Sequence, residues 1–260
     1  MTNTIITELQ TDVLVIRFNR PAQLNAWTMP MREVLCEILD EAVRSNDVRA
    51  LVFTGTGNEG FCAGQDLAET EKFAGRAHAK DWIDRLKFVY DKIRAIPKPV
   101  VGAINGVAAG SGFQLTLLMD INVGHRGVTM GQTEVNSGIP SVLGPAMMVE
   151  SLGRARTTEL AVTGRLMGAD ECHRYGLIHH LVDPTQVLEK AVEIARDLAS
   201  KPAVAMKLTK EYLRRNNEAD YEQAWKWAEE GQLEAFASGE PQQAMREFFE
   251  ARRTRKAAGR

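Results

Sequence analysis

The stretch from Pro97 to Leu115 is the part of the chain whose residue types and spacing best fit a chemical site. Val100–Ile104 is a short apolar run, typical of a strand buried on both faces. A glycine-rich turn follows, and from Phe113 a run without glycine or proline predicts a buried helix. Backbone N–H groups at a helix start lack an intrahelical partner, so this arrangement can hold a negatively charged oxygen.

The turn does not match three common ligand-binding motifs. Gly110 and Gly112 begin a dinucleotide fingerprint, but Leu115 stands where its third glycine is required. No lysine follows for a phosphate loop, and the glycines beside Ser111 have the wrong offsets for a hydrolase nucleophile elbow. Two interpretations stay open: an oxyanion site made from main-chain donors, or a tight connection whose glycines serve packing alone.

The composition is that of an ordinary globular protein. The chain has 260 residues, of which 44% are hydrophobic and 25% charged, and its net charge is −2. This balance does not favour binding to nucleic acid or to a membrane surface. The N-terminus has no signal-peptide pattern, and no apolar run approaches the ~18 residues of a membrane span.

Cysteines and histidines show no metal-binding pattern. Cys36, Cys62 and Cys172 are odd in number and lie in unrelated contexts, which predicts reduced thiols and a cytoplasmic protein without a metal site. His179 and His180 are adjacent and would face opposite sides of a strand, so a histidine-dependent hydrolase is not favoured.

The hydrophobic pattern predicts strands alternating with helices. A first clear strand at 13–18 and further strands at 50–54, 121–124 and 128–130 are expected, with helices at 30–44 and 77–96. A strand–strand–helix unit recurs about every 45 residues, which predicts stacked turns of similar layout. The predicted buried face of the helix at 30–44 consists of Met31, Val34, Leu35, Ile38, Leu39 and Ala42.

The chain becomes helical after residue 140. Helical segments at 146–152, 155–163 and 169–175 precede a short strand at 180–182, and every segment after 183 is predicted to be helical. In the last part, Tyr221, Trp225, Ala228 and Phe236 share one helix face. This face either packs on the core of its own chain, makes subunit contacts or covers a site.

Several stretches together resemble the enoyl-CoA hydratase/isomerase (crotonase) family, in the right order over almost the whole chain. They are Asn19-Arg20-Pro21, Leu24-Asn25-Ala26, Phe61 to Leu67, Pro97-Lys98-Pro99, Asn105-Gly106, Gly110-Ser111-Gly112, Gly131 to Glu134 and Gly138-Ile139-Pro140. The resemblance implies an α/β fold: a spiral of repeated strand–strand–helix turns over 1–200 and a C-terminal helical region over 201–260. It also implies trimers that usually pair into hexamers.

The family chemistry implies an acyl-CoA thioester as the substrate and no separate cofactor, since coenzyme A is part of the substrate. The thioester carbonyl becomes an enolate oxyanion, and the resemblance places its two backbone N–H donors at Gln65 and Ser111, where smaller residues often occur. Further matches imply that five positions line the coenzyme A groove: Leu24, Ala26, Ala63, Asp66 and Leu67.

The proton carriers depart from the family pattern. Typical hydratases carry two glutamates, whereas this chain has Gln114 at the first position and Glu134 at the second. A glutamine cannot carry a proton and can only orient water or a substrate group. Glu134, in an apolar pocket, is expected to have a raised pKa and to act as the acid/base.

Several reactions remain open at this point. One glutamate suffices for a double-bond shift, while hydration or dehydration would require Glu134 to handle both water and the α-proton, or Gln114 to hold the water. A C–C bond hydrolase and an isomerase of ring-derived acyl-CoA are also compatible. A member of the fold that binds coenzyme A esters without catalysis is less favoured, because it would not need Glu134.

Overall fold

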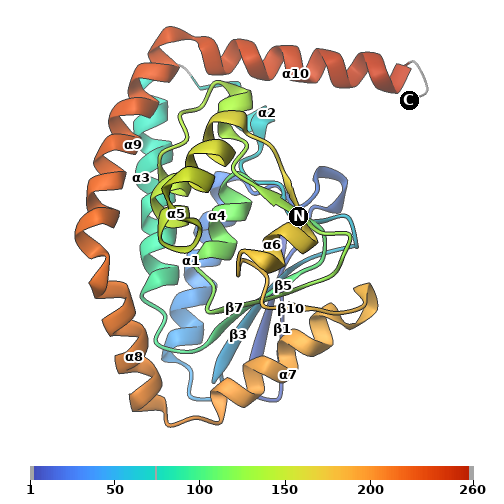
Figure 1. The fold of residues 1–260 in the computed structure, drawn as a ribbon, viewed down its shortest axis with the longest axis vertical. Helices are drawn as coiled ribbons and strands as arrows, with labels where there is room; N and C mark the ends of the chain where they lie inside the picture. Colours follow the sequence, from blue (N-terminus) through green and yellow to red (C-terminus); the bar gives the residue numbers. More distant parts are fainter. Residues whose placement is uncertain (1–2, 74, 258–260) are drawn as a thin grey trace.

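The protein is described by a computed structural model, which covers residues 3–73 and 75–257. The predicted spiral region (1–200) begins with residues 1–2 and the predicted helical region (201–260) ends with residues 258–260, and these residues lie outside the described ones. Within the described part, the chain forms two sheets that are enclosed by helices (Figure 1).

The larger sheet has six strands in the order β1-β2-β3-β5-β7-β10, and only the β1–β2 pair is antiparallel. All residues of β3 and β5 are buried, as expected for parallel strands covered on both faces. The strands are β1 (Ile5–Gln10), β2 (Val13–Phe18), β3 (Ala50–Gly55), β5 (Val100–Ile104), β7 (Ile121–Gly124) and β10 (His180–Leu181).

The smaller sheet has four short strands in the order β4-β6-β8-β9. They are β4 (Gly60–Cys62), β6 (Val107–Ala109), β8 (Thr129–Gly131) and β9 (Met167–Gly168). Successive turns of the chain place one strand in each sheet, as β3/β4, β5/β6 and β7/β8, and helical segments follow. The predicted α/β spiral of strand–strand–helix turns is confirmed.

Helices cover both faces of the larger sheet. On one face, α7 (Val187–Ala199) packs its small apolar residues on valines and alanines of β2, β3, β5 and β7. On the other face lie α1 (Met29–Arg44) and α3 (Gly75–Arg94), which contribute to the main hydrophobic core. The short helical elements are η1 (Pro21–Gln23), α2 (Leu67–Thr70), α4 (Ser111–Leu117), η2 (Glu134–Ser137), α6 (Ala169–Arg174) and η3 (Pro184–Gln186).

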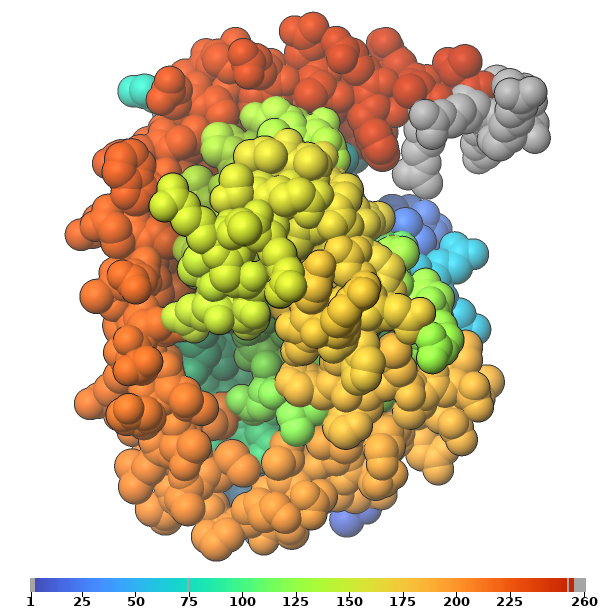
Figure 2. Space-filling view, viewed as in Figure 1, coloured from blue at the N-terminus to red at the C-terminus, as the bar shows by residue number. Residues whose placement is uncertain are grey.

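The C-terminal helices wrap around one edge of the molecule (Figures 1 and 2). They are α8 (Ala203–Asn216), α9 (Glu218–Ser238) and α10 (Glu240–Ala257). Trp225 of α9 meets Tyr90 of α3 with ring centroids 5.7 Å apart, and Phe236 meets Trp82 at 6.1 Å. The aromatic face of α9 therefore packs on the core of its own chain.

Several element boundaries differ from the predictions. β1 was not expected, because four of its six residues are exposed and its sequence mixes polar and apolar residues. β4, β6 and β9 were also missed, since strands of two or three residues show no period. Helix α5 (Leu143–Thr163) joins two predicted segments across Gly153, whose φ of 69° interrupts the helical backbone.

The predicted face of α1 was wrong at Val34 and Ile38, which are not buried, and it left out Arg32 and Cys36, which are buried. Val34 is 39% exposed, whereas Arg32 is 1% exposed. In the described chain, no helix combines the length and the apolar character that crossing a lipid bilayer requires.

Candidate active site

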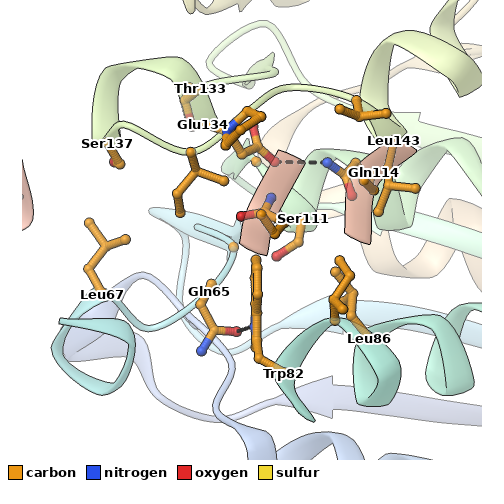
Figure 3. A pocket seen from close by; sticks show the side chains of 18 of the residues that line it. Gln65, Leu67, Trp82, Leu86, Ser111, Gln114, Thr133, Glu134, Ser137 and Leu143 are labelled. Carbon is orange, nitrogen blue, oxygen red and sulfur yellow. Dashed lines mark hydrogen bonds between the residues drawn. The ribbon is translucent and has the colours of Figure 1, made fainter. Parts of the chain in front are cut away.

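A pocket lies between the loop after β4, the start of α4, η2, the start of α5 and the sides of α3 and α9, and its free space, including the open mouth, is about 670 Å³. Figure 3 shows Glu134 and Gln114 on one side, Gln65 and Trp82 on the other, and Ser111 between them. The lining residues are Ala63, Gly64, Gln65, Leu67, Trp82, Ile83, Leu86, Gly110, Ser111, Gln114, Thr133, Glu134, Ser137, Ile139, Pro140, Val142, Leu143, Ala228 and Gln232.

Ser111 is the first residue of α4, two residues before the helix start expected from sequence. Gly110 precedes it with φ 55° and ψ −128°, a conformation that favours glycine. At Gly112, a Cβ atom would lie 2.0 Å from the Cys62 carbonyl oxygen, so only glycine lets the helix approach β4 this closely. The turn thus presents the Ser111 N–H, which has no acceptor within its helix, at the pocket.

The Gln65 backbone lies beside this turn. The Trp27 N–H donates to the Gly64 carbonyl oxygen at 2.9 Å, and the Asp66 N–H donates to the Trp27 carbonyl oxygen at 3.0 Å. Because these flanking groups face Trp27, the N–H of Gln65 points away from it. A Cβ built on Gly64 would lie 3.3 Å from the Ser111 nitrogen. The two turns are therefore in contact at the pocket.

A buried arginine supports the Gln65 side chain. Arg32 and Trp82 both donate to Gln65 Oε1, the latter at 3.1 Å, and Gln65 Nε2 donates to Glu69 at 2.7 Å. The Arg32 guanidinium stacks over Trp27 at 4.8 Å, and burial lowers its pKa to about 10. The Gln65 amide is thereby held by protein groups on both its oxygen and its nitrogen.

Glu134 begins the 3₁₀ helix η2 and faces the pocket. Its Oε2 atom is buried and has no hydrogen-bond partner among the described residues. Burial raises the pKa of Glu134 from the usual 4.5 to about 7, despite hydrogen bonds that favour the charged form. A carboxyl group with this pKa can both take up and release a proton near neutral pH.

Gln114 contacts Glu134 directly. Its Nε2 donates to Glu134 Oε1 at 2.8 Å and lies 3.3 Å from Gln132 Oε1 (Figure 3 shows the first contact). Its Oε1 accepts a hydrogen bond from the Tyr90 hydroxyl at 2.8 Å. The Tyr90 hydroxyl also lies 3.2 Å from the Ser111 carbonyl oxygen, and its shorter bond to Gln114 Oε1 leaves the amide hydrogens directed at Glu134 and Gln132.

The residues expected to form the coenzyme A groove are only partly assembled at this pocket. Ala63 and Leu67 line it, whereas Leu24, Ala26 and Asp66 do not. These three remain linked to the same loops: the Leu24 carbonyl accepts from Ala63 N–H at 3.0 Å, and Arg20 joins the Ala26 carbonyl to the Asp66 carboxylate at 2.7 Å each.

Sequence reasoning missed Tyr90, Arg32, Gln132 and Gln232. Tyr90, Arg32 and Gln232 come from segments far from the motifs, so no local spacing marks them, whereas Gln132 stands inside the stretch from Gly131 to Glu134 and only its contact with Gln114 was not expected. The described residues contain no group of three or more histidine, cysteine or acidic side chains able to hold a metal ion. Within the described lining of the pocket, Glu134 is the only side chain that carries a proton near neutral pH.

Comparison with known proteins identifies the family. The family model for enoyl-CoA hydratase/isomerase matches residues 8–256. The chain is 31% identical to a short-chain-enoyl-CoA hydratase of Clostridium acetobutylicum over 96% of both chains. It is 33% identical to a 1,2-epoxyphenylacetyl-CoA isomerase of Escherichia coli over 80% of both.

Solved structures show the same fold. An enoyl-CoA hydratase from Bacillus anthracis superposes with a TM-score of 0.78 at 30% identity, covering 88% of this chain and 90% of that one. An enoyl-CoA hydratase/isomerase from Xanthobacter autotrophicus gives a TM-score of 0.88 at 24% identity, covering 98% and 94%. The protein belongs to the enoyl-CoA hydratase/isomerase family.

Proposed function

We propose that the protein is an acyl-CoA isomerase that moves the double bond of a 3-enoyl-CoA to the 2-position. The observation that carries this proposal is the single proton-carrying side chain, Glu134, among the described pocket residues. A double-bond shift needs one group that removes a proton from one carbon and returns it to another. Its raised pKa of about 7 suits Glu134 to both halves of this task.

The proposed reaction has two steps. The Glu134 carboxylate takes a proton from C2, and the electron pair forms a dienolate whose charge rests largely on the thioester oxygen. The N–H groups of Gln65 and Ser111 donate to this oxygen, at roughly 3 kcal/mol per donor. Protonated Glu134 then returns the proton to C4, which leaves the double bond between C2 and C3. No water, metal or separate cofactor enters this sequence.

Hydration is less favoured because the Gln114 amide already has protein partners. Its nitrogen is within hydrogen-bonding distance of Glu134 and Gln132, and its oxygen accepts from Tyr90. An amide engaged in this way is poorly placed to hold a water molecule for attack. One relative is named a short-chain-enoyl-CoA hydratase and another a 1,2-epoxyphenylacetyl-CoA isomerase, so hydration is the alternative that the experiment must separate.

Mass spectrometry in deuterated water tests the proposal. The panel contains 2-enoyl, 3-enoyl, 3-hydroxy and cyclic acyl-CoA thioesters, and Glu134→Gln serves as the control variant. Isomerisation predicts a moved double bond and deuterium uptake without a mass gain of water. Net addition of water would make the protein a hydratase, cleavage of the acyl skeleton would make it a hydrolase, and unchanged thioesters would favour a binding role.

The pH dependence of the reaction should reflect the ionisation of the Glu134 carboxyl group. Since the base must be ionised in the free enzyme, kcat/KM is expected to rise about tenfold per pH unit below about pH 7 and to level off above it. A pH series with a 3-enoyl-CoA measures this profile. An inflection near pH 4.5, the usual carboxyl value, would mean that Glu134 is not held in the buried environment described.

Restoring the missing carboxylate should change the reaction. In Gln114→Glu, two carboxyl groups would lie at hydrogen-bond distance and share a proton, with Tyr90 donating to the new one. We expect hydratase activity toward a simple 2-enoyl-CoA to rise, about tenfold or more. Water addition measured by loss of the enoyl absorbance checks this, with Gln114→Met as a matched control that lacks a second acid. No gain would mean that the missing carboxylate does not limit hydration.

The surroundings of the site fit a coenzyme A thioester and an oligomer. We propose that Leu24, Ala26, Ala63, Asp66 and Leu67 contribute to the coenzyme A groove. We also propose a homotrimer or a dimer of trimers, supported by exposed apolar side chains on the C-terminal helices, such as Tyr212 at 68% and Trp227 at 61%. A cytoplasmic location is supported by Cys36, Cys62 and Cys172, all free thiols.

A further inference from the structure

Gln232 places an unpaired amide in the wall of the pocket. This residue of α9 is 4% exposed and lines the pocket together with Ala228, one helical turn earlier. Its Oε1 atom is buried and has no hydrogen-bond partner among the described residues. A buried amide oxygen without a partner is unfavourable, so its place in a ligand pocket calls for an explanation.

The other pocket amides are already engaged. Gln65 is held by Arg32, Trp82 and Glu69, and Gln114 by Tyr90 and Glu134. Gln232 has no such hydrogen bond within the described structure, although it lies in the same pocket. Its Oε1 has almost no accessible surface in the empty pocket, so a bound molecule reaches this amide first at Nε2, and at Oε1 once the side chain turns.

The surroundings of Gln232 define what it can bind. About half of the wall is apolar and includes Trp82, Leu86, Ile139 and Leu143. The described lining contains no lysine, arginine or histidine, so a carboxylate on the acyl group would be buried without a counter-ion. An amide offers one acceptor and one donor group, which match the donor and acceptor of a hydroxyl.

We propose that the natural acyl group carries a neutral oxygen function, a hydroxyl, which pairs with the Gln232 amide. The inference rests on the proposed function only in that the pocket holds the acyl part of a coenzyme A thioester. A plain hydrocarbon chain would leave the amide unpaired and would bind less well. A chain ending in a carboxylate would bind less well still, because its charge would be desolvated and unpaired.

Calorimetric binding of saturated acyl-CoA thioesters tests this without any turnover. Three series of matched chain length end in a methyl, a hydroxyl or a carboxylate group. The wild-type protein is expected to bind the best-fitting hydroxyl thioester about tenfold to a hundredfold more tightly than its methyl counterpart. In Gln232→Met, which keeps the length of the side chain, this preference should disappear or reverse.

Gln242→Met is the matched control. Gln242 also has a buried, unpaired Oε1, but its Nε2 donates to the Phe73 carbonyl at 3.1 Å and it lies outside the pocket lining. The control should keep the wild-type preference for the hydroxyl. Gln232→Leu repeats the test if Gln232→Met does not fold, and the wild-type series is decisive by itself.

The inference is overturned if the wild-type protein binds the methyl or carboxylate series as tightly as the hydroxyl series at every length. It is also overturned if both Gln232 variants keep the preference, or if no thioester binds. Tight, hydroxyl-selective binding combined with no reaction of any enoyl-CoA would leave the inference intact and remove the proposed isomerase function.

Discussion

Glu134→Gln is expected to lower kcat for the isomerisation about 10³-fold. The change keeps the shape of the side chain but removes the carboxyl group that we propose takes and returns the proton, and such groups typically contribute 10² to 10⁴-fold. Single-turnover measurements with a 3-enoyl-CoA give the rate, and calorimetry with a saturated acyl-CoA checks that binding is retained. A variant with nearly wild-type turnover would show that another group carries the proton.

The same variant should be more stable than the wild-type protein in alkaline solution. In the folded state, burial raises the pKa of Glu134 to about 7 from the usual 4.5. The unfolded chain therefore loses this proton first, and the folded state becomes relatively less stable as the pH rises from about 4.5 to about 7. Glu134→Gln should gain about 1–3 kcal/mol in the free energy of unfolding at pH 8 and nothing at pH 4, as measured in urea.

Gly64→Ala is expected to lower kcat about 10² to 10³-fold, the range seen when an oxyanion donor is lost. The backbone there has φ 87°, and the new Cβ would lie 2.7 Å from the Ala109 carbonyl oxygen and 3.3 Å from the Ser111 nitrogen. The turns of Gln65 and Ser111 must then move apart, which would separate the two N–H groups that we propose as oxyanion donors. Steady-state kinetics should show the loss in kcat rather than in KM, since the donors act on charge that develops during the reaction.

Gly57→Ala is the matched control for this prediction. Gly57 has a similar φ of 82°, but its nearest neighbour would lie at 3.7 Å, on Pro21, away from the pocket lining. Both variants should lose roughly 1–2 kcal/mol of stability from the left-handed backbone. If Gly57→Ala lost as much activity as Gly64→Ala, backbone strain rather than the position of the donors would explain the effect.

The repeating architecture could be predicted because most of its strands and helices show a hydrophobic pattern within their own few residues. The strand at 100–104 is apolar throughout and buried throughout. β1 could not be predicted in this way, because only Ile5 among its residues is buried and the strand is held by the ladder of β2 rather than by its own pattern.

The candidate site also has one part that could be predicted from the sequence and one part that could not. Gln65, Ser111, Gln114 and Glu134 were expected together from the resemblance, and the structure brings all four to one pocket. The residues around them depend on long-range contacts. Arg32 stands among the polar residues of α1, and its contacts with Gln65, thirty-three positions later, and with the Trp27 ring are made only in the folded chain.

The hydroxyl of Tyr90 also bears on how this site can change in evolution. Gln114 accepts from that hydroxyl and donates to Glu134, and a glutamic acid would fit the same space with a proton on the oxygen that faces Glu134. Glutamine and glutamate codons differ by a single base. A one-base mutation therefore exchanges a one-acid for a two-acid site on the same backbone, and this is the step that we expect to separate the proposed isomerase chemistry from hydration.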